Sequence, residues 1–276
     1  MTKTIRLPID LGQEGYVRFV RKVDGGLLAT TILAQVNYQG ELRRAYLKIY
    51  NLAEQPKSVW NEVLGYLFAQ AMDIPSPPVF FVDVPPQDVI ASGCGFVPTQ
   101  IAVRAVATLE AHDPNVATDG AAKTLFEAGS VDLSQIRRRL LSSPAGRALV
   151  AFDEVVGNPD RNIGNIVFSW KHGVVAIDHG CILTGPWWTS QSLNSTHDYP
   201  NKAFNVVNDK PLRDLEKSAL QAAAQVMLET YYEAMLPLQN AMGYRTNIET
   251  TAAFDFVWWR AQRLTQRMAH MLQLVI

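Results

Sequence analysis

The sequence has little of several features that define large classes of protein. Only two of its 276 residues are cysteines, Cys94 and Cys181, and they have neither metal-ligand spacing nor the pairs of a disulfide framework. No run of about 18 apolar residues is present, as a membrane span requires, and the N-terminal M-T-K-T-I-R-L-P-I-D lacks the apolar region of a secretory signal. With a net charge of −1 and one short basic run, Arg137 to Arg139, no positive patch for nucleic acid is expected. We therefore predict a cytoplasmic protein with reduced thiols, no membrane span and no nucleic-acid partner of its own.

Several catalytic motifs are also missing. There is no Walker G-x-x-x-x-G-K-[ST], no G-x-G-x-x-G and no nucleophile elbow of the G-x-S-x-G type. His112, His179 and His197 have no ligand spacing, so zinc is not expected.

What is present is an apolar content of 48%, enough for one large domain or two lobes with their own cores. The N-terminal part favours strands at Tyr16 to Val23, Leu28 to Val36 and Leu42 to Tyr50, separated by turn signals, so a three-stranded meander is predicted. A helix with Ser58 as its N-cap follows and ends before the prolines at 75, 77 and 78. Two more strands are predicted at 79–84 and 101–106, with a loop containing Pro85-Pro86 and the segment 92–95 between them.

The C-terminal part is predicted to be mostly helical. Helices are expected at Leu133 to Leu141, from Pro144 to Val156, at Leu212 to Met235 and at Ala252 to Leu274. The expected fold class is α+β, with a β-rich lobe containing one helix (residues 1–107) and a larger helical lobe (residues 108–276). Together they would form one catalytic domain.

The most informative residues are Asp160, Asn165 and Asp178, in V-G-N-P-D-R-N-I-G-N-I-V-F followed by V-V-A-I-D-H-G. The first Asp can accept a proton from a hydroxyl, and the Asn and second Asp can supply oxygen ligands for Mg²⁺ held on ATP phosphates. Strands at 166–169 and 174–177 form a hairpin that brings Asn165 and Asp178 together. These residue types are also common in turns, but the second acid at the end of the partner strand favours a phosphotransferase site.

A second group of residues would contact the nucleotide. Lys48 lies in the apolar strand A-Y-L-K-I-Y and can reach phosphates when a Glu on the next helix holds it, and Glu62 is the predicted partner. A solvent-facing lysine on an edge strand is the alternative. Asp24, Gly25 and Gly26 lie where a phosphate-covering loop is expected, although two glycines are also typical of a simple hairpin turn.

Three other residues near the motif have open roles. Arg161 is expected to pair with Asp160 and hold its orientation or to neutralise the site, with a solvent-facing side chain as the alternative. Trp187 and Trp188 are expected to pack under the segment that follows Asp178, with a substrate wall as the alternative.

With these motifs in view, the chain resembles the HipA-like kinases and, more distantly, the phosphatidylinositol 3/4-kinases, all of the protein-kinase-like superfamily. G-N-P-D-R-N-I-G-N-I with the later A-I-D-H-G is similar to the HipA pattern G-N-x-D-R-H-x-x-N followed by an Asp, with Asn162 in place of the usual His. N-E-V-L-G-Y-L-F-A-Q-A-M-D-I-P-S-P-P is similar to the helix that carries the glutamate. The resemblance implies a bilobal kinase fold with ATP in the cleft, Asp160 as base, Asn165 and Asp178 as metal ligands, and the phosphate-anchoring pair Lys48–Glu62.

The expected function is ATP- and Mg²⁺-dependent phosphoryl transfer, and the resemblance favours a Ser/Thr hydroxyl of a protein as acceptor. It also suggests an antitoxin-like or regulatory partner. A small-molecule or lipid kinase is an alternative within the same class, and a nucleotide-binding pseudokinase or scaffold is the alternative outside it.

Overall fold

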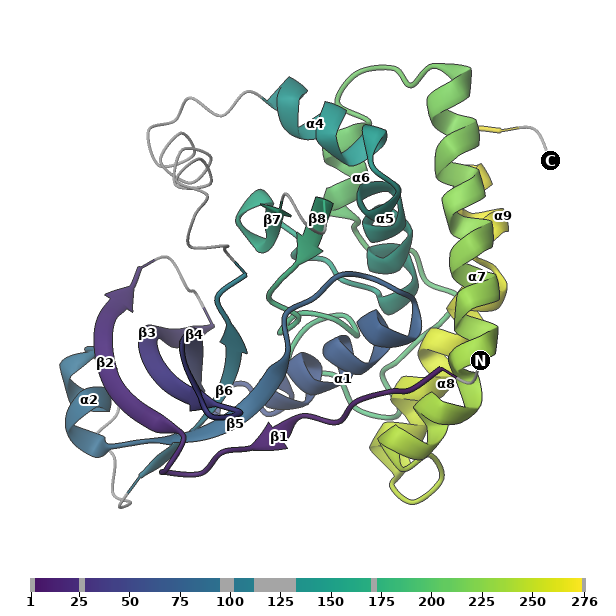
Figure 1. The fold of residues 1–276 in the computed structure, drawn as a ribbon. Coiled ribbons are helices and arrows are strands. Elements are labelled where there is room, and N and C mark those ends of the chain that lie inside the picture. The colour runs from purple at the N-terminus through teal and green to yellow at the C-terminus, as the bar shows by residue number, and fades with distance from the viewer. Residues whose placement is uncertain (1–2, 25–27, 95–101, 112–132, 170–172, 275–276) are drawn as a thin grey trace.

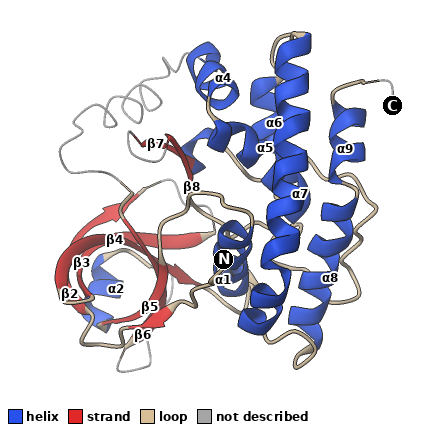
Figure 2. Cartoon of the chain, turned by 45° about the vertical axis from the view of Figure 1, so that its right-hand side comes forward, coloured by secondary structure: helices blue, strands red, loops and turns tan. Residues whose placement is uncertain are grey.

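The chain folds into an α+β structure in which a mixed six-stranded sheet lies beside a group of helices (Figures 1 and 2). The computed structural model describes residues 3–24, 28–94, 102–111, 133–169 and 173–274. The described strands are β1 (Ile9–Asp10), β2 (Tyr16–Val23), β3 (Ala29–Tyr38), β4 (Glu41–Tyr50), β5 (Val79–Val84), β6 (Val103–Leu109), β7 (Ile166–Ser169) and β8 (Gly173–Ala176). The described helices are α1 (Ser58–Ala71), α2 (Pro86–Ala91), α4 (Leu133–Ser142), α5 (Pro144–Val156), η1 (Ile163–Asn165, a 3₁₀ turn), α6 (Lys202–Val207), α7 (Asp214–Met242), α8 (Ile248–Gln262) and α9 (Leu264–Met271).

The larger sheet has the strand order β1-β5-β6-β4-β3-β2. The meander predicted from the sequence is confirmed, because β2, β3 and β4 pair antiparallel in chain order. β5 and β6 are the two further strands, and β6 pairs with both β5 and β4. Strand β1 was not predicted. It is two residues long and runs parallel to β5, too short to show an alternating pattern.

The two faces of β4 differ, and this difference positions Lys48. Ala45, Leu47 and Ile49 alternate along the strand and are buried in the core of the sheet. Because neighbouring side chains on a strand point to opposite faces, Lys48 lies on the other face. Val106, its partner on β6, belongs to the core of the helical part. Lys48 therefore faces the boundary between sheet and helices.

Helix α1 lies at that boundary, between the sheet and the other helices (Figure 1). Its buried residues Leu64, Leu67 and Phe68 share one core with residues of β5, β6, α5 and α7. The predicted start was one residue off, because Lys57 is the N-cap and Ser58 is the first helical residue. The Ser58 hydroxyl donates instead to Gln55 Oε1 at 3.2 Å.

The segment after β5 corrects a second prediction. We expected a loop at Pro85-Pro86, whereas α2 begins at Pro86. Proline at the first position of a helix loses no hydrogen bond, since that N–H has no partner inside the helix. A Pro-Pro pair can therefore start a short helix as readily as it can form a loop.

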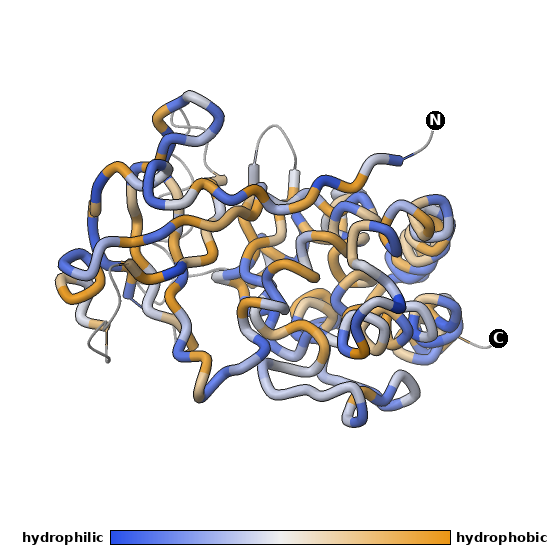
Figure 3. Tube along the Cα trace, turned by 90° about the horizontal axis from the view of Figure 1, so that it is seen from below, coloured by the Kyte–Doolittle hydropathy of each residue, from blue (hydrophilic) through white to orange (hydrophobic). Residues whose placement is uncertain are grey.

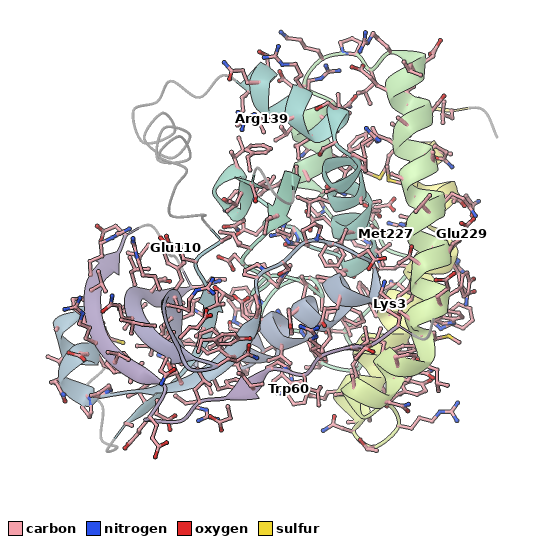
Figure 4. The ribbon with its side chains drawn as sticks, viewed as in Figure 1. Lys3, Trp60, Glu110, Arg139, Met227 and Glu229 are labelled. Carbon is pink, nitrogen blue, oxygen red and sulfur yellow. The ribbon has the colours of Figure 1, made fainter. Side chains whose placement is uncertain are left out.

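The helical part largely follows the predicted pattern. Helix α5 begins at Pro144, is capped by the Ser143 hydroxyl and ends at Gly157 with a left-handed φ of 58°. On α7, Met227 points into the core and Glu229 lies on the exposed face (Figure 4). Seen from below, the helices carry hydrophobic and hydrophilic residues alternately around their turns (Figure 3). One helix was predicted over 252–274, but the structure has α8 and α9, which meet at Arg263.

Candidate functional site

The two strands of the predicted hairpin, β7 and β8, lie between Asn165 and Asp178. Strands β7 and β8 pair antiparallel, with Ile166 opposite Ala176. At the open end of the hairpin, the Ile177 N–H donates to the Asn165 carbonyl at 3.1 Å. This bond joins the backbone of Asn165 to the residue that precedes Asp178. Asn165 Nδ2 also donates to the Asp160 carbonyl at 3.2 Å. The three residues of the acid–Asn–acid motif therefore lie in one connected loop system.

Asp178 ends the hairpin in a left-handed conformation with a φ of 60°. This is an uncommon conformation for a residue with a side chain, and it directs the carboxylate toward Lys48. Oδ1 accepts from Lys48 Nζ at 2.7 Å and from the Gly180 N–H at 3.4 Å. Burial acts to raise the pKa of Asp178, but Lys48 outweighs it and lowers that pKa to about 2. The carboxylate is therefore ionised at neutral pH.

Lys48 and Glu62 are brought together as the sequence predicted, since Lys48 Nζ donates to Glu62 Oε1 at 2.5 Å. Burial acts to lower the pKa of Lys48, but the carboxylates of Asp178 and Glu62 together raise it above its ordinary value. The lysine therefore keeps its charge and bridges one carboxylate on α1 and one on the loop after β8. It does not face solvent as an edge-strand lysine would, because only 12% of its side chain is exposed.

The Glu62 carboxylate is completely buried and accepts from three donors. Oε1 accepts from Lys48 and from the Tyr50 hydroxyl at 2.8 Å, and Oε2 accepts from the His179 N–H at 3.0 Å. These bonds connect β4, α1 and the segment after β8. Burial and the nearby Glu62 and Asp178 raise the pKa of Tyr50 well above its ordinary value, so its hydroxyl stays a donor.

Asp160 has a partner that the sequence did not reveal. Its Oδ1 accepts from Lys202 Nζ at 2.5 Å, and its backbone N–H donates to Asn158 Oδ1 at 3.1 Å. The Cys181 thiol approaches Oδ2 at 4.0 Å. Burial, followed by the charges of Asp160 and Asp178, raises the pKa of Cys181 to about 12. The thiol is therefore protonated and can act as a weak donor, not as a nucleophile.

Arg161 corrects the prediction that it pairs with Asp160 or faces solvent. Its side chain is fully buried, and Nε donates to both oxygens of Asp153 on α5 at 3.1 and 3.2 Å. Nη1 donates to the carbonyls of Asn165, Ile177 and Asp178. A guanidinium has five N–H donors in a fixed plane, which suits this role. Arg161 therefore fastens the hairpin ends to α5.

His179, next to Asp178, is fixed from several sides. Its Nδ1 lies 3.3 Å from Arg161 Nη2, and its Nε2 lies 3.1 Å from Ser76 Oγ. Because arginine can only donate, Nδ1 accepts and Nε2 carries the proton. Burial, and then the charges of Arg161 and Lys48, lower the pKa of His179 well below its ordinary value, so the ring is neutral. A Cβ at Gly65 of α1 would lie 2.3 Å from His179 Cβ, which shows how closely the helix packs on it.

Asn61, beside Glu62 on α1, was not predicted as a site residue. It is fully buried, and its Nδ2 donates to the carbonyls of Gly180, Ile182 and Gly185 at 2.8 to 3.0 Å. Its Oδ1 accepts from Trp188 Nε1 at 2.7 Å. Trp188 is buried, in line with the packing role predicted for it. Trp187 differs, because 62% of it is exposed and its Nε1 donates to the Glu54 carbonyl at 2.7 Å.

The predicted metal ligands have donor atoms of the kind that Mg²⁺ prefers. No hydrogen bond within the described residues uses Asn165 Oδ1 or Asp178 Oδ2, and the Asn165 amide is oriented by its bond to the Asp160 carbonyl. In the same part of the chain, no group of three or more His, Cys, Asp or Glu side chains could hold a metal by itself. A site with two protein oxygens completed by phosphate oxygens fits this donor set.

The predicted phosphate-covering turn is only partly visible. Asp24 is exposed just after β2, and Gly25 and Gly26 lie outside the described residues. Within the described part of the chain, no hydrogen bond or ion pair joins Asp24 to the cluster around Lys48.

No protein-family model matches the chain, and the search of curated proteins found no match either. None of the helices in the described part of the chain is long and apolar enough to cross a membrane.

Proposed function

We propose that the protein is an ATP- and Mg²⁺-dependent phosphotransferase of the HipA-like kinase type. The observation that carries the proposal is the position of Lys48, whose Nζ lies 2.5 Å from Glu62 Oε1 and 2.7 Å from Asp178 Oδ1. A lysine ammonium has three N–H donors, and these contacts use two of them. The third is available to a phosphate oxygen beside the proposed metal ligand.

The bilobal arrangement belongs to the same proposal. Residues 1–107 would form the small lobe and 108–276 the large one, in a single catalytic domain. The two hydrophobic cores support it, since one lies within the sheet and the other joins α1 to the helices. Nucleotide would bind between the lobes, where Lys48 and Asp178 meet.

Each residue would have a defined task. Glu62 holds Lys48, and Lys48 neutralises phosphate charge. Asn165 and Asp178 would hold the Mg²⁺, which supplies further positive charge to the phosphates when bound. Asp160 orients the acceptor hydroxyl and accepts its proton. The hydroxyl oxygen forms a bond to the γ-phosphorus while the bond to the β-phosphate oxygen breaks, and ADP leaves with that electron pair.

The acceptor we propose is a Ser/Thr hydroxyl of a protein, in a cytoplasmic setting and with a regulatory partner of the antitoxin kind. Asp160 supports an accessible acceptor, since 42% of its side chain is exposed. A small-molecule or lipid hydroxyl is the alternative acceptor, and the same exposed carboxylate would serve it.

The test is transfer of labelled γ-phosphate from Mg²⁺-ATP, measured with wild type, Asp160→Ala and Asp178→Ala. The matched control is Asp209→Ala, which removes an exposed aspartate beyond α6. We expect both site variants to lose about 10³-fold or more in rate, since each removes a group that acts on the transferring phosphoryl, while the control keeps wild-type activity. Full activity in either site variant would refute the proposal. ATP binding without transfer by wild type would identify a pseudokinase.

A further inference from the structure

Lys202 is the one described cation that contacts the proposed catalytic base. Its Nζ lies 2.5 Å from Asp160 Oδ1, although the two residues are 42 positions apart in the sequence. Both side chains are partly open to solvent, with 46% of Lys202 and 42% of Asp160 exposed. The mechanism proposed above assigns no role to the contact between Lys202 and Asp160.

The backbone of Lys202 is held firmly beside the site. The preceding residue, Asn201, is buried, and its Nδ2 donates to the Val150 carbonyl of α5 at 2.9 Å. Asn201 Oδ1 accepts from the Phe204 N–H at 2.8 Å, which caps α6. Helix α5 leads directly into Gly157 and the loop that carries Asp160. The start of α6 and the loop of Asp160 are therefore fixed to the same helix.

Stability alone does not explain why a lysine stands here. An ion pair as exposed as this one contributes little to folding. While the ammonium is bound to Oδ1 of Asp160, that oxygen is also not free to accept the proton of an acceptor hydroxyl. The contact is useful to a phosphotransferase if the ammonium can move from the carboxylate to a charge that develops close by.

Such a charge develops within reach of Lys202. The attacking oxygen must lie about 3–3.5 Å from the phosphorus for reaction, and Asp160 must be within hydrogen-bond distance of that oxygen. The transferring phosphoryl group is thus only a few ångströms from Asp160. The flexible, half-exposed side chain of Lys202 can span this distance, whereas Lys48 is already bound to two carboxylates.

We propose that Lys202 is a catalytic residue of the phosphoryl transfer. It holds Asp160 in place before the acceptor binds. It then shifts to the oxygens of the transferring phosphoryl group and frees the carboxylate to accept the proton. This inference rests on the proposed function and adds a residue to that site.

The experiment compares Mg²⁺-ATP turnover, with water as acceptor, in wild type, Lys202→Met, Lys202→Arg and the control Lys210→Met. Lys210 is an exposed lysine just beyond α6 that contacts no carboxylate within the described residues. We expect Lys202→Met to lower kcat by about 100-fold, as for loss of one transition-state donor, while the KM for ATP changes less than about 3-fold. Lys202→Arg should recover part of the rate, since it keeps the charge, and Lys210→Met should match wild type.

Two readouts separate a catalytic role of Lys202 from a structural one. The Tm of Lys202→Met should equal that of wild type, because the exposed pair contributes little to stability. The loss of kcat in Lys202→Met should leave the KM for ATP almost unchanged and should be partly reversed in Lys202→Arg, a pattern that a loss of structure would not produce.

Each other outcome overturns the inference. An unchanged kcat in Lys202→Met would show that the lysine takes no part, and a raised kcat would show that it blocks the base. A lower Tm in Lys202→Met, with no recovery of the rate in Lys202→Arg, would assign a structural role. If wild type turns over ATP and Asp160→Ala does not, these results bear on Lys202 alone. If wild type shows no turnover at all, the proposed function fails and the inference fails with it.

Discussion

Replacing Glu62 with Gln tests the core of the site without reference to any ligand. The substitution keeps the shape of the side chain and removes its charge. The carboxylate accepts on both oxygens, from Lys48 and Tyr50 on one side and from the His179 N–H on the other. An amide has only one oxygen, so in either orientation its NH₂ group must face at least one buried donor.

The size of the effect follows from this geometry. A buried donor left without an acceptor costs about 1–3 kcal/mol, and removing one partner of a buried ion pair costs about 3–5 kcal/mol. Lys48 keeps Asp178 as a partner, which places the expected loss at the lower end, about 3 kcal/mol. Domains of ordinary stability unfold with about 5–15 kcal/mol, so the variant should still fold.

Urea unfolding followed by tryptophan fluorescence measures this loss directly. Glu233→Gln is the matched control, because Glu233 is exposed on α7. That control should stay within about 0.5 kcal/mol of wild type. If Glu62→Gln also stays within that range, the three-donor arrangement around the carboxylate is not the one that forms in solution.

Two further predictions concern His179. Its pKa is held well below 6.5 by burial and then by Arg161 and Lys48. Below pH 6.5 the unfolded state therefore binds a proton that the native state does not. The free energy of unfolding should then fall by up to about 1.4 kcal/mol for each unit by which the pH is lowered. Unfolding measured from pH 7 to pH 5 should show this slope in wild type and a flatter one in His179→Gln, and parallel slopes would contradict the assignment. In Gly65→Ala the new Cβ would lie 2.3 Å from His179 Cβ, so we expect a loss of about 1–3 kcal/mol from overpacking. A rise in Tm, the usual result of Gly→Ala inside a helix, would show that α1 does not pack on His179 in this way.

Much of this fold could be predicted because its signals are local. The meander, α1, α5 and the β7–β8 hairpin each have a period or a turn signal within about ten residues. The pairing of Lys48 with Glu62 was also predictable, since a charged residue in an apolar strand requires a partner and the next helix offers a carboxylate.

The residues that escaped prediction depend on contacts between distant segments. Arg161 lies in a polar loop, where arginine is usually solvated, yet it is buried because three backbone carbonyls and Asp153 converge on it. Asn61 lies on the buried face of an apolar helix and has no local partner, because its acceptors lie more than a hundred positions away. Lys202 belongs to a segment with no regular sequence pattern, and the anchoring of Asn201 to α5 together with the burial of Ala203 and Phe204 places it at Asp160.

Helix α1 connects the two halves of the candidate site through two successive residues. Glu62 binds Lys48 on β4, and Asn61 holds the carbonyls of the segment 180–185. Successive residues on a helix point about 100° apart, so one turn of α1 can contact the sheet and the loop after Asp178 at the same time. The donor–acceptor distances in both sets of bonds are only 2.5 to 3.0 Å. A tilt of the helix would therefore lengthen and break both sets together. The position of α1 therefore determines whether Lys48 and Asp178 can face each other.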